Sequence, residues 1–272
     1  MTSAVLLDPH PAFSDLLRSW RKINKVSQGA LSGITGISQR HLSFLESGRS
    51  TPSREMVLRL ASAFELPLRE KNALLTAAGF ASIYTENNID DEAMKQAKNA
   101  LSVMLEHHNP YGAIVVDRNW NLLMMNDANV KVFSHFMDPL KVWEDVGGST
   151  PNMIRVTLHE KGLRPYIQNF EDFGRYFIHQ LETELSANPY NRGAKELLDE
   201  VMTYPDMPNN RGESNTSPTP FLSMSLKKDD LELELFTMVS TFGTPQDVTL
   251  QEIRIETFFP GNDTTDQWIR SL

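Results

Sequence analysis

The stretch Gly36–Ser53, GISQRHLSFLESGRSTPS, brings amide, guanidinium and hydroxyl side chains together within one short segment. Ser38 is a suitable N-cap, which would place Gln39 and Arg40 in the first turn of a helix and Ser43 one turn later. Gln can form two hydrogen bonds with adenine and Arg can form two with guanine. We therefore expect Gln39, Arg40 and Ser43 to be able to contact the edges of DNA bases.

Nearby residues are suited to contact with phosphate groups. Gln28 and Ser38 stand at the starts of two expected helices, Arg49 follows the second of these helices, and Lys22 is on the basic side of an earlier one. Such side chains, with helix-terminal amides, hold a protein against a polyanion without reading its sequence. The alternative for Ser38 is that it serves only as an N-cap.

A different set of residues, in the second half of the chain, could form an apolar pocket with few polar groups, the usual form of a small-molecule site. An apolar lining with one cation would suit an amphipathic carboxylate such as a fatty acid. The alternative is that the apolar members only fill a core and that Arg155 pairs with a neighbouring acid. The expected ligand-binding residues are Trp120, Leu122, Met124, Asn126, Phe133, Arg155, Phe170, Phe173 and Phe177.

The sequence contains no recognisable motif for catalysis or metal binding. The chain has no cysteine, and its seven histidines form no HExxH or zinc-spaced set. Gly147-Gly148-Ser149 lacks the lysine that would follow in a phosphate-binding loop. We therefore expect no enzymatic activity, no catalytic residue, no metal and no cofactor other than a bound fatty acid or similar molecule.

Charge divides unevenly along the 272 residues. Residues 1–79 hold 10 Lys and Arg against 6 Asp and Glu, whereas residues 80–272 hold 16 against 29, so +4 and −13 give the total of −9. Only the first part is therefore expected to meet nucleic acid. No apolar run approaches the about 20 residues needed to span a bilayer, and no membrane partner is expected. With the absence of cysteine, this favours a cytoplasmic protein.

The elements that would position these residues begin with five short helices in residues 1–79. Phe13–Asn24 has helical spacing of apolar residues, and further helices are expected after Ser27, Ser38, Thr51–Ser53 and Pro67. Their shared core is expected to include Leu31, Ile34, Ile37, Leu42 and Leu45. Residues 80–92 are polar and rich in turn formers, and are expected to link this bundle to a second domain, residues 93–272.

In the second domain, Tyr111–Asn126 has two apolar runs around a turn, which predicts a β-hairpin. Three later strands are expected at Pro220–Leu226, Leu231–Thr241 and Val248–Pro260. Together they predict a five-stranded antiparallel sheet with helices on one side, the layout of a PAS-type domain. The expected helices span residues 92–106, 127–137, 153–160, 170–185 and 194–204.

The segment Ser27–Ser53, SQGALSGITGISQRHLSFLESGRSTPS, resembles the helix-turn-helix of Xre/Cro-type repressors. The resemblance implies that the helix after Ser38 enters the DNA major groove, with Gln39 and Arg40 reading bases. It also implies a structural pair between Glu46 and Arg21. Gly29 and Gly33 depart from the family, which usually has better helix formers there.

Over nearly its whole length the chain resembles MmyB-like transcription regulators. The resemblance rests on RHLSFLESGRSTPSREMVLRLASAFELPLREKNALLTAAGF, on DRNWNLLMMN after a valine-rich strand, and on NMIRVTLHEKGLRPYIQNFEDF. It implies an all-α helix-turn-helix bundle followed by an α+β PAS-like ligand-binding domain. The expected partners are a double-stranded DNA operator and a small-molecule effector. A homodimer is expected because one short reading head gives too little specificity. The alternative is a second domain that serves only dimerisation or protein interaction.

Overall fold

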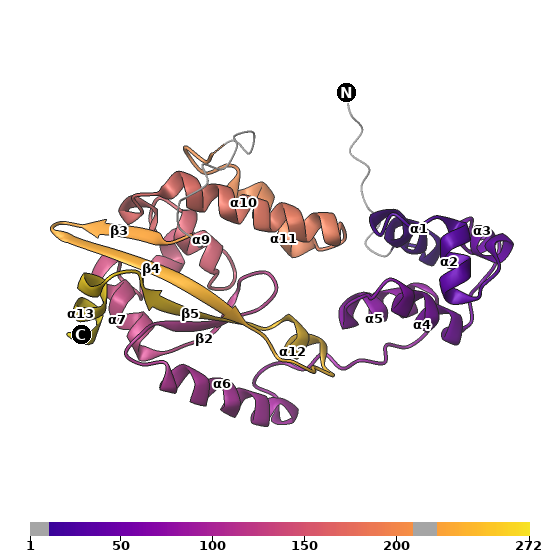
Figure 1. The fold of residues 1–272 in the computed structure, drawn as a ribbon, viewed down its shortest axis with the longest axis horizontal. Coiled ribbons are helices and arrows are strands. Elements are labelled where there is room, and N and C mark those ends of the chain that lie inside the picture. Colours follow the sequence, from indigo (N-terminus) through magenta and orange to yellow (C-terminus); the bar gives the residue numbers. More distant parts are fainter. Residues whose placement is uncertain (1–10, 209–221) are drawn as a thin grey trace. The chain divides into compact units, whose positions relative to one another are not determined.

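The computed structural model describes residues 11–208 and 222–272, and these form two compact units (Figure 1). The first unit comprises Met1–Asn87 together with Thr244–Gln251, and the second comprises Asn88–Gly243 and Glu252–Leu272. The expected linker, residues 80–92, is thus divided between the two units. None of the helices in the described ranges is long and apolar enough to cross a membrane.

Five helices build the N-terminal part of the first unit, as the apolar spacing predicts. They are α1 (Phe13–Ile23), α2 (Gln28–Thr35), α3 (Gln39–Glu46), α4 (Arg54–Ala63) and α5 (Leu68–Ala77). The core contains Leu17, Leu31, Leu42, Leu45 and Leu60, none of which is exposed. The prediction for Ile34 was wrong, because α2 turns Leu31 and Thr35 inward and leaves Ile34 63% exposed.

The turn between α2 and α3 depends on two residues that the sequence singles out. Gly36 has a φ of 67°, in the left-handed region where a side chain is strained. Ser38 then caps α3, because its Oγ accepts a hydrogen bond from the amide of His41 at 3.3 Å. This pairing of a left-handed glycine with an N-cap sets the start of α3.

A segment from late in the chain completes the first unit. Residues Val248–Glu252 form α12, where the sequence predicted the beginning of a strand, and that prediction was wrong. The amide of Val248 donates to the carbonyl of Thr85 at 2.8 Å, and Val248 is fully buried. The Gln251 Oε1 atom accepts a hydrogen bond from the amide of Leu68, at the start of α5, where Pro67 makes no side-chain cap.

A five-stranded antiparallel sheet forms the second unit, with strand order β2-β1-β5-β4-β3. The strands are β1 (Ala113–Val116), β2 (Leu122–Met125), β3 (Met224–Lys228), β4 (Leu231–Ser240) and β5 (Arg254–Pro260). The hairpin prediction and the five-stranded sheet are confirmed. The strand predicted at Pro220–Leu226 begins with residues 220 and 221, which lie outside the described residues.

Helices cover both faces of the sheet, whereas the sequence predicted one covered face. The main core joins Ile114 and Val116 of β1 to residues of the helices between β2 and β3. Leu101 and Leu105 are buried outside this core, on α6, which lies against the opposite face (Figure 1). The second unit contains η1 (Glu92–Met94), α6 (Lys95–His107), α7 (Asp127–Phe136), α8 (Val142–Val146), α9 (Met153–Leu158), η2 (Arg164–Tyr166), α10 (Phe170–Ala187), α11 (Arg192–Val201) and α13 (Asp263–Arg270).

Candidate nucleic-acid interface and ligand pocket

Helix α3 presents the predicted base-contacting residues on an exposed face. Gln39, Arg40 and Ser43 are exposed, while Leu42 and Leu45 are fully buried and fix the opposite face of the helix. The guanidinium of Arg40 lies 5.5 Å from the centre of the Phe44 ring, which supports the side chain along the helix surface. The face therefore carries donors and acceptors that are free of competing core contacts.

Glu46 holds α1, α2 and α3 together beneath that face. Its Oε2 atom accepts hydrogen bonds from Arg21 Nη2 at 2.9 Å and from Gln28 Nε2 at 3.0 Å, and Arg18 donates to its main-chain carbonyl. Burial alone would raise the pKa of Glu46, but the hydrogen bonds from Arg21 and Gln28 outweigh it and hold the pKa below its ordinary value. This geometry agrees with the structural pair expected between Arg21 and Glu46.

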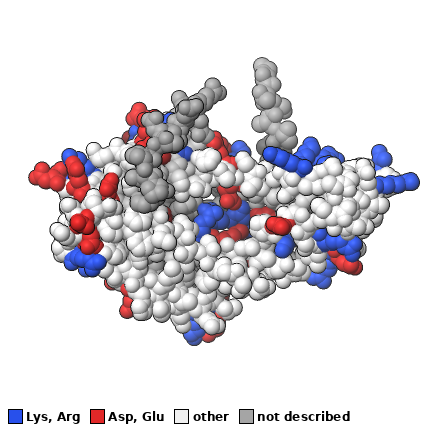
Figure 2. All heavy atoms as spheres, in the orientation of Figure 1, with Lys and Arg blue, Asp and Glu red and all other residues white. Residues whose placement is uncertain are grey.

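The predicted phosphate contacts separate into exposed and engaged residues. Lys22 and Arg49 are exposed, and Ser38 is exposed while capping α3. The Gln28 amide is half-buried and bonded to Glu46, so its side chain also has a structural task. Figure 2 shows Lys and Arg side chains projecting from the surface of the helical unit.

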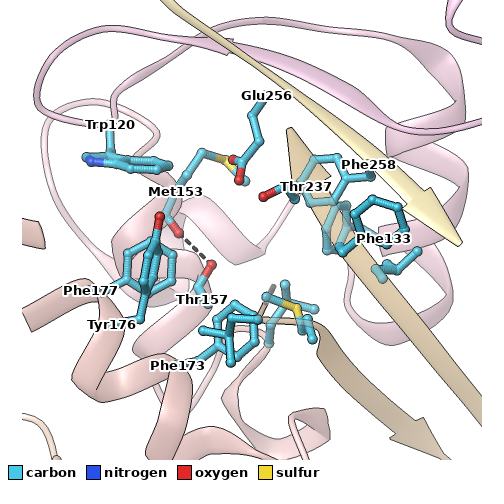
Figure 3. A pocket seen from close by; sticks show the side chains of 15 residues that line it. Trp120, Phe133, Met153, Thr157, Phe173, Tyr176, Phe177, Thr237, Glu256 and Phe258 are labelled. Carbon is cyan, nitrogen blue, oxygen red and sulfur yellow. Dashed lines mark hydrogen bonds between the residues drawn. The ribbon is translucent and has the colours of Figure 1, made fainter. Parts of the chain in front are cut away.

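The second unit contains an apolar cavity of about 160 Å³, here called the main cavity (Figure 3). Its walls come from β4 and β5 on one side and from α9 and α10 on the other, with Trp120 from the β1–β2 turn. The rings of Trp120 and Phe177 meet edge to face at 5.6 Å between centroids. The lining residues are Trp120, Phe133, Met153, Thr157, Leu163, Phe173, Tyr176, Phe177, Leu222, Met224, Leu235, Phe236, Thr237, Glu256 and Phe258.

Four of the predicted ligand-binding residues meet at the main cavity, namely Trp120, Phe133, Phe173 and Phe177. Leu122 instead lines a second cavity of about 50 Å³, which shares Phe133 and Met153 with the first. Trp120 reaches its place through a backbone φ of 65°, unusual for a bulky residue, and its carbonyl accepts a hydrogen bond from the amide of Met153 at 2.9 Å.

The other predicted polar anchors line neither cavity. Arg155 Nε and Nη2 bind the two carboxylate oxygens of Glu200 at 2.8 and 2.7 Å, the ion pair that was its alternative role. The Asn126 side chain caps α7 and uses its remaining groups on main-chain atoms, including the amide of Ala113 and the carbonyl of Tyr111. Both side chains are therefore committed to structure.

Two predicted apolar residues are also outside the cavities, for reasons of geometry. Met124 pairs with Val115, whereas Ile114, which belongs to the core, pairs with Met125. Met124 therefore points to the α6 side of the sheet. Phe170 stands at the start of α10 with the Arg164 guanidinium 4.6 Å from its ring centre.

Sequence reasoning missed the polar residues of the main cavity. Glu256 and Thr237 project from β5 and β4 into it, and burial raises the pKa of the Glu256 carboxyl to about 7 although the Thr237 hydroxyl acts to lower it. Thr157 donates its hydroxyl to the carbonyl of Met153 at 2.7 Å. The signal for Glu256 was its place in the alternating run RIETFFP, but such an alternation equally fits a solvated strand face.

Models of two known protein families match the chain. A model described as the MmyB-like transcription regulator ligand binding domain matches residues 97–272, which is more than half of the chain. A helix-turn-helix model matches residues 17–71, which include all of α2, α3 and α4. They also include Glu46 with Arg18, Arg21 and Gln28, here called the Glu46 cluster. No curated protein matches the chain.

Proposed function

We propose a mechanism from the premise that the chain belongs to the MmyB-like transcription regulators, and so is a DNA-binding transcription regulator with a ligand-binding domain. In this mechanism, α3 reads an operator in the major groove through Gln39 and Arg40. A small amphipathic molecule occupies the main cavity, in a PAS-like domain, and changes the affinity for DNA. Such a regulator acts where the DNA is, which is the basis for proposing a cytoplasmic location.

The DNA-binding half of the proposal is supported by the geometry of α3. Its exposed side chains are those that can pair with guanine and adenine, while its buried leucines and the Glu46 cluster keep the helix in one orientation. Exposed Lys22 and Arg49 add attraction to phosphates that does not depend on base sequence. We propose that two copies act together, since paired half-sites supply the specificity that one helix lacks.

The ligand-binding half rests on one observation, the aromatic and aliphatic lining of the main cavity. An engineered apolar cavity of about 150 Å³ binds benzene, so a cavity of about 160 Å³ has room for a molecule of this size. A fatty-acid-like molecule suits the lining, but Arg155, the cation expected for its carboxylate, is bonded to Glu200. We therefore propose an amphipathic ligand whose apolar part occupies the main cavity.

Connectivity of the chain supports an effect of the ligand on DNA binding. The strands that contribute Thr237 and Glu256 to the main cavity are joined through residues 244–251, which belong to the helical unit. A ligand changes DNA affinity only if it favours one arrangement of the protein over another. Movement at these strand ends would be passed directly to that segment.

The first test is selection of DNA by the full-length protein from a random oligonucleotide library, repeated with two variants. We expect Arg40→Ala to abolish sequence preference, whereas Arg49→Ala should weaken binding to all DNA and reduce the dependence on salt. Equal changes of competitor ratio and salt dependence in both variants would contradict the division into base and phosphate contacts.

Mass spectrometry before and after solvent extraction would reveal whether a small molecule accompanies the purified protein.

A further inference from the structure

The described residues that line the main cavity supply one carboxyl and no cation. Among the described residues that line it, Glu256 is acidic and none is Lys, Arg or His. The other polar side chains are hydroxyls and an indole, from Thr157, Tyr176, Thr237 and Trp120. The electrostatic character of this lining is therefore set by Glu256.

The position of Glu256 in the sheet directs its side chain into the cavity. In the register of β5, Glu256 is opposite Ile114 of β1 and Val239 of β4, and it stands two residues before Phe258. Because Ile114 and Phe258 belong to the main core, Glu256 is on the same face. Figure 3 shows its carboxyl group within the cavity, between the Trp120 ring and the Thr237 hydroxyl.

Cations close to this face are already held by other carboxylates. Arg254, two residues before Glu256, lies 3.6 Å from Glu184 and has its guanidinium 5.8 Å from the centre of the Trp120 ring. Arg118 binds both Glu184 and Glu252, at 3.1 and 2.9 Å. The carboxyl of Glu256 therefore enters an apolar space with the Thr237 hydroxyl as its polar neighbour, and no ion pair with another described residue offsets its desolvation.

A partly buried carboxyl at the wall of an apolar cavity favours ligands that donate a hydrogen bond to it. A ligand ammonium would form a charge-assisted pair in a region of low dielectric constant, where such a pair is stronger than in water. A ligand carboxylate would instead place a second negative charge beside Glu256 without a lining cation to balance it. A ligand hydroxyl should bind beside Glu256 less tightly than an ammonium and more tightly than a carboxylate.

We propose that Glu256 is the polar anchor of the main cavity and that it selects a small amphipathic amine, with the ammonium on Glu256 and the apolar body against the aromatic wall. This assignment rests on the proposed ligand-binding function of the second unit. It concerns the head group of the ligand, and can be tested separately from the existence of the site.

The test measures binding of four compounds to the solvent-extracted full-length protein by calorimetry. Benzylamine, benzyl alcohol and phenylacetate share one apolar body and differ in the head group, while toluene lacks the head group. We expect benzylamine to bind at least about tenfold more tightly than phenylacetate, as charge-assisted hydrogen bonds of this kind allow. Toluene binding reports the cavity alone.

The matched variants are Glu256→Gln and Glu232→Gln, the second of which removes an exposed carboxyl outside the lining of the cavity. Glu256→Gln should weaken benzylamine about tenfold and change toluene by less than about threefold, whereas Glu232→Gln should change neither. If phenylacetate binds wild-type protein as tightly as benzylamine, the assignment of the head group is overturned, even if Glu256→Gln fails to fold. If toluene and all three relatives fail to bind, the proposed cavity itself is overturned.

Discussion

Glu46 ties α3 to its two neighbouring helices, because its carboxylate is 6% exposed and accepts hydrogen bonds from both α1 and α2. We expect Glu46→Gln to destabilise the helical unit by roughly 2–4 kcal/mol, since Arg21 would be left partly buried without its charge partner. Amide hydrogen exchange in α1–α3 would measure the loss.

The pH dependence of this effect follows from the lowered pKa of Glu46. The stabilisation is fully present above the ordinary carboxyl pKa of 4.5 and is lost as the pH falls through the lower pKa of the folded state. The difference between wild type and Glu46→Gln should therefore be full at neutral pH and shrink in acid. The control is Glu55→Gln, whose partner Arg59 is 49% exposed, and it should cost less than about 0.5 kcal/mol. Equal exchange rates in the two variants would contradict the structural role.

Among the residues of the main cavity, the sequence predicted four of the aromatic lining residues but not the polar residue Glu256. Trp120, Phe133, Phe173 and Phe177 are large apolar residues in segments expected to be strand or helix, so their burial could be expected from the sequence. Glu256 alternates with Ile255 and Thr257, and a polar residue in such a strand is normally assigned to the solvated face. Only the helices packed over β5 turn that position into the wall of a cavity.

Two glycines at the C-terminal end of α2, one within the helix and one directly after it, should respond to substitution in opposite ways. Gly33 is within the helix and an added Cβ would meet nothing within 4 Å, whereas Gly36 has a φ of 67°. Gly33→Ala should stabilise the helical unit by roughly 0.5–1 kcal/mol, and Gly36→Ala should destabilise it by about 1 kcal/mol or more. Thermal unfolding of the two variants gives the sign of each change, and shifts in the same direction would contradict the assigned backbone states.

Element boundaries followed from the sequence where local signals were strong, and failed where tertiary contacts decide. Caps and glycines placed α2 and α3, because those signals act within a few residues. Val248–Glu252 contains the β-favouring pair Val-Thr and was predicted as strand. It is helical, and tertiary contacts in the first unit bury Val248 and hold its amide on the carbonyl of Thr85. The register of β1 and β2 shifts by one residue between the pairs Val115–Met124 and Val116–Leu122, and this irregularity has no sequence signature.

At the scale of the whole molecule, the helical unit is built from two separate parts of the chain. Residues 244–251 join it from more than 150 residues beyond Asn87, through hydrogen bonds and the buried side chain of Val248. A division of the sequence by composition predicts a linker at residues 80–92, because turn-forming residues gather there, and the end of the first part at Asn87 lies within this range. It cannot find the returning segment, which is short and resembles the strands around it.

Asp247 is one of the residues that hold the returning segment: it is buried and accepts hydrogen bonds from the main-chain amide and the side-chain amide of Asn87, at 3.2 and 2.9 Å. Asp247→Ala would remove these bonds and leave the Asn87 groups to find water, so we expect faster amide exchange in residues 80–87 and in α5, whose first amide is capped by Gln251. Exchange in β1 should not change. Asp230→Ala, at an exposed turn between β3 and β4, is the control for loss of an acidic side chain. If Asp247→Ala leaves α5 as protected as Asp230→Ala does, the segment contributes no stability to the helical unit, and a DNA-binding fragment ending at residue 87 should then be as stable as the unit within the full chain.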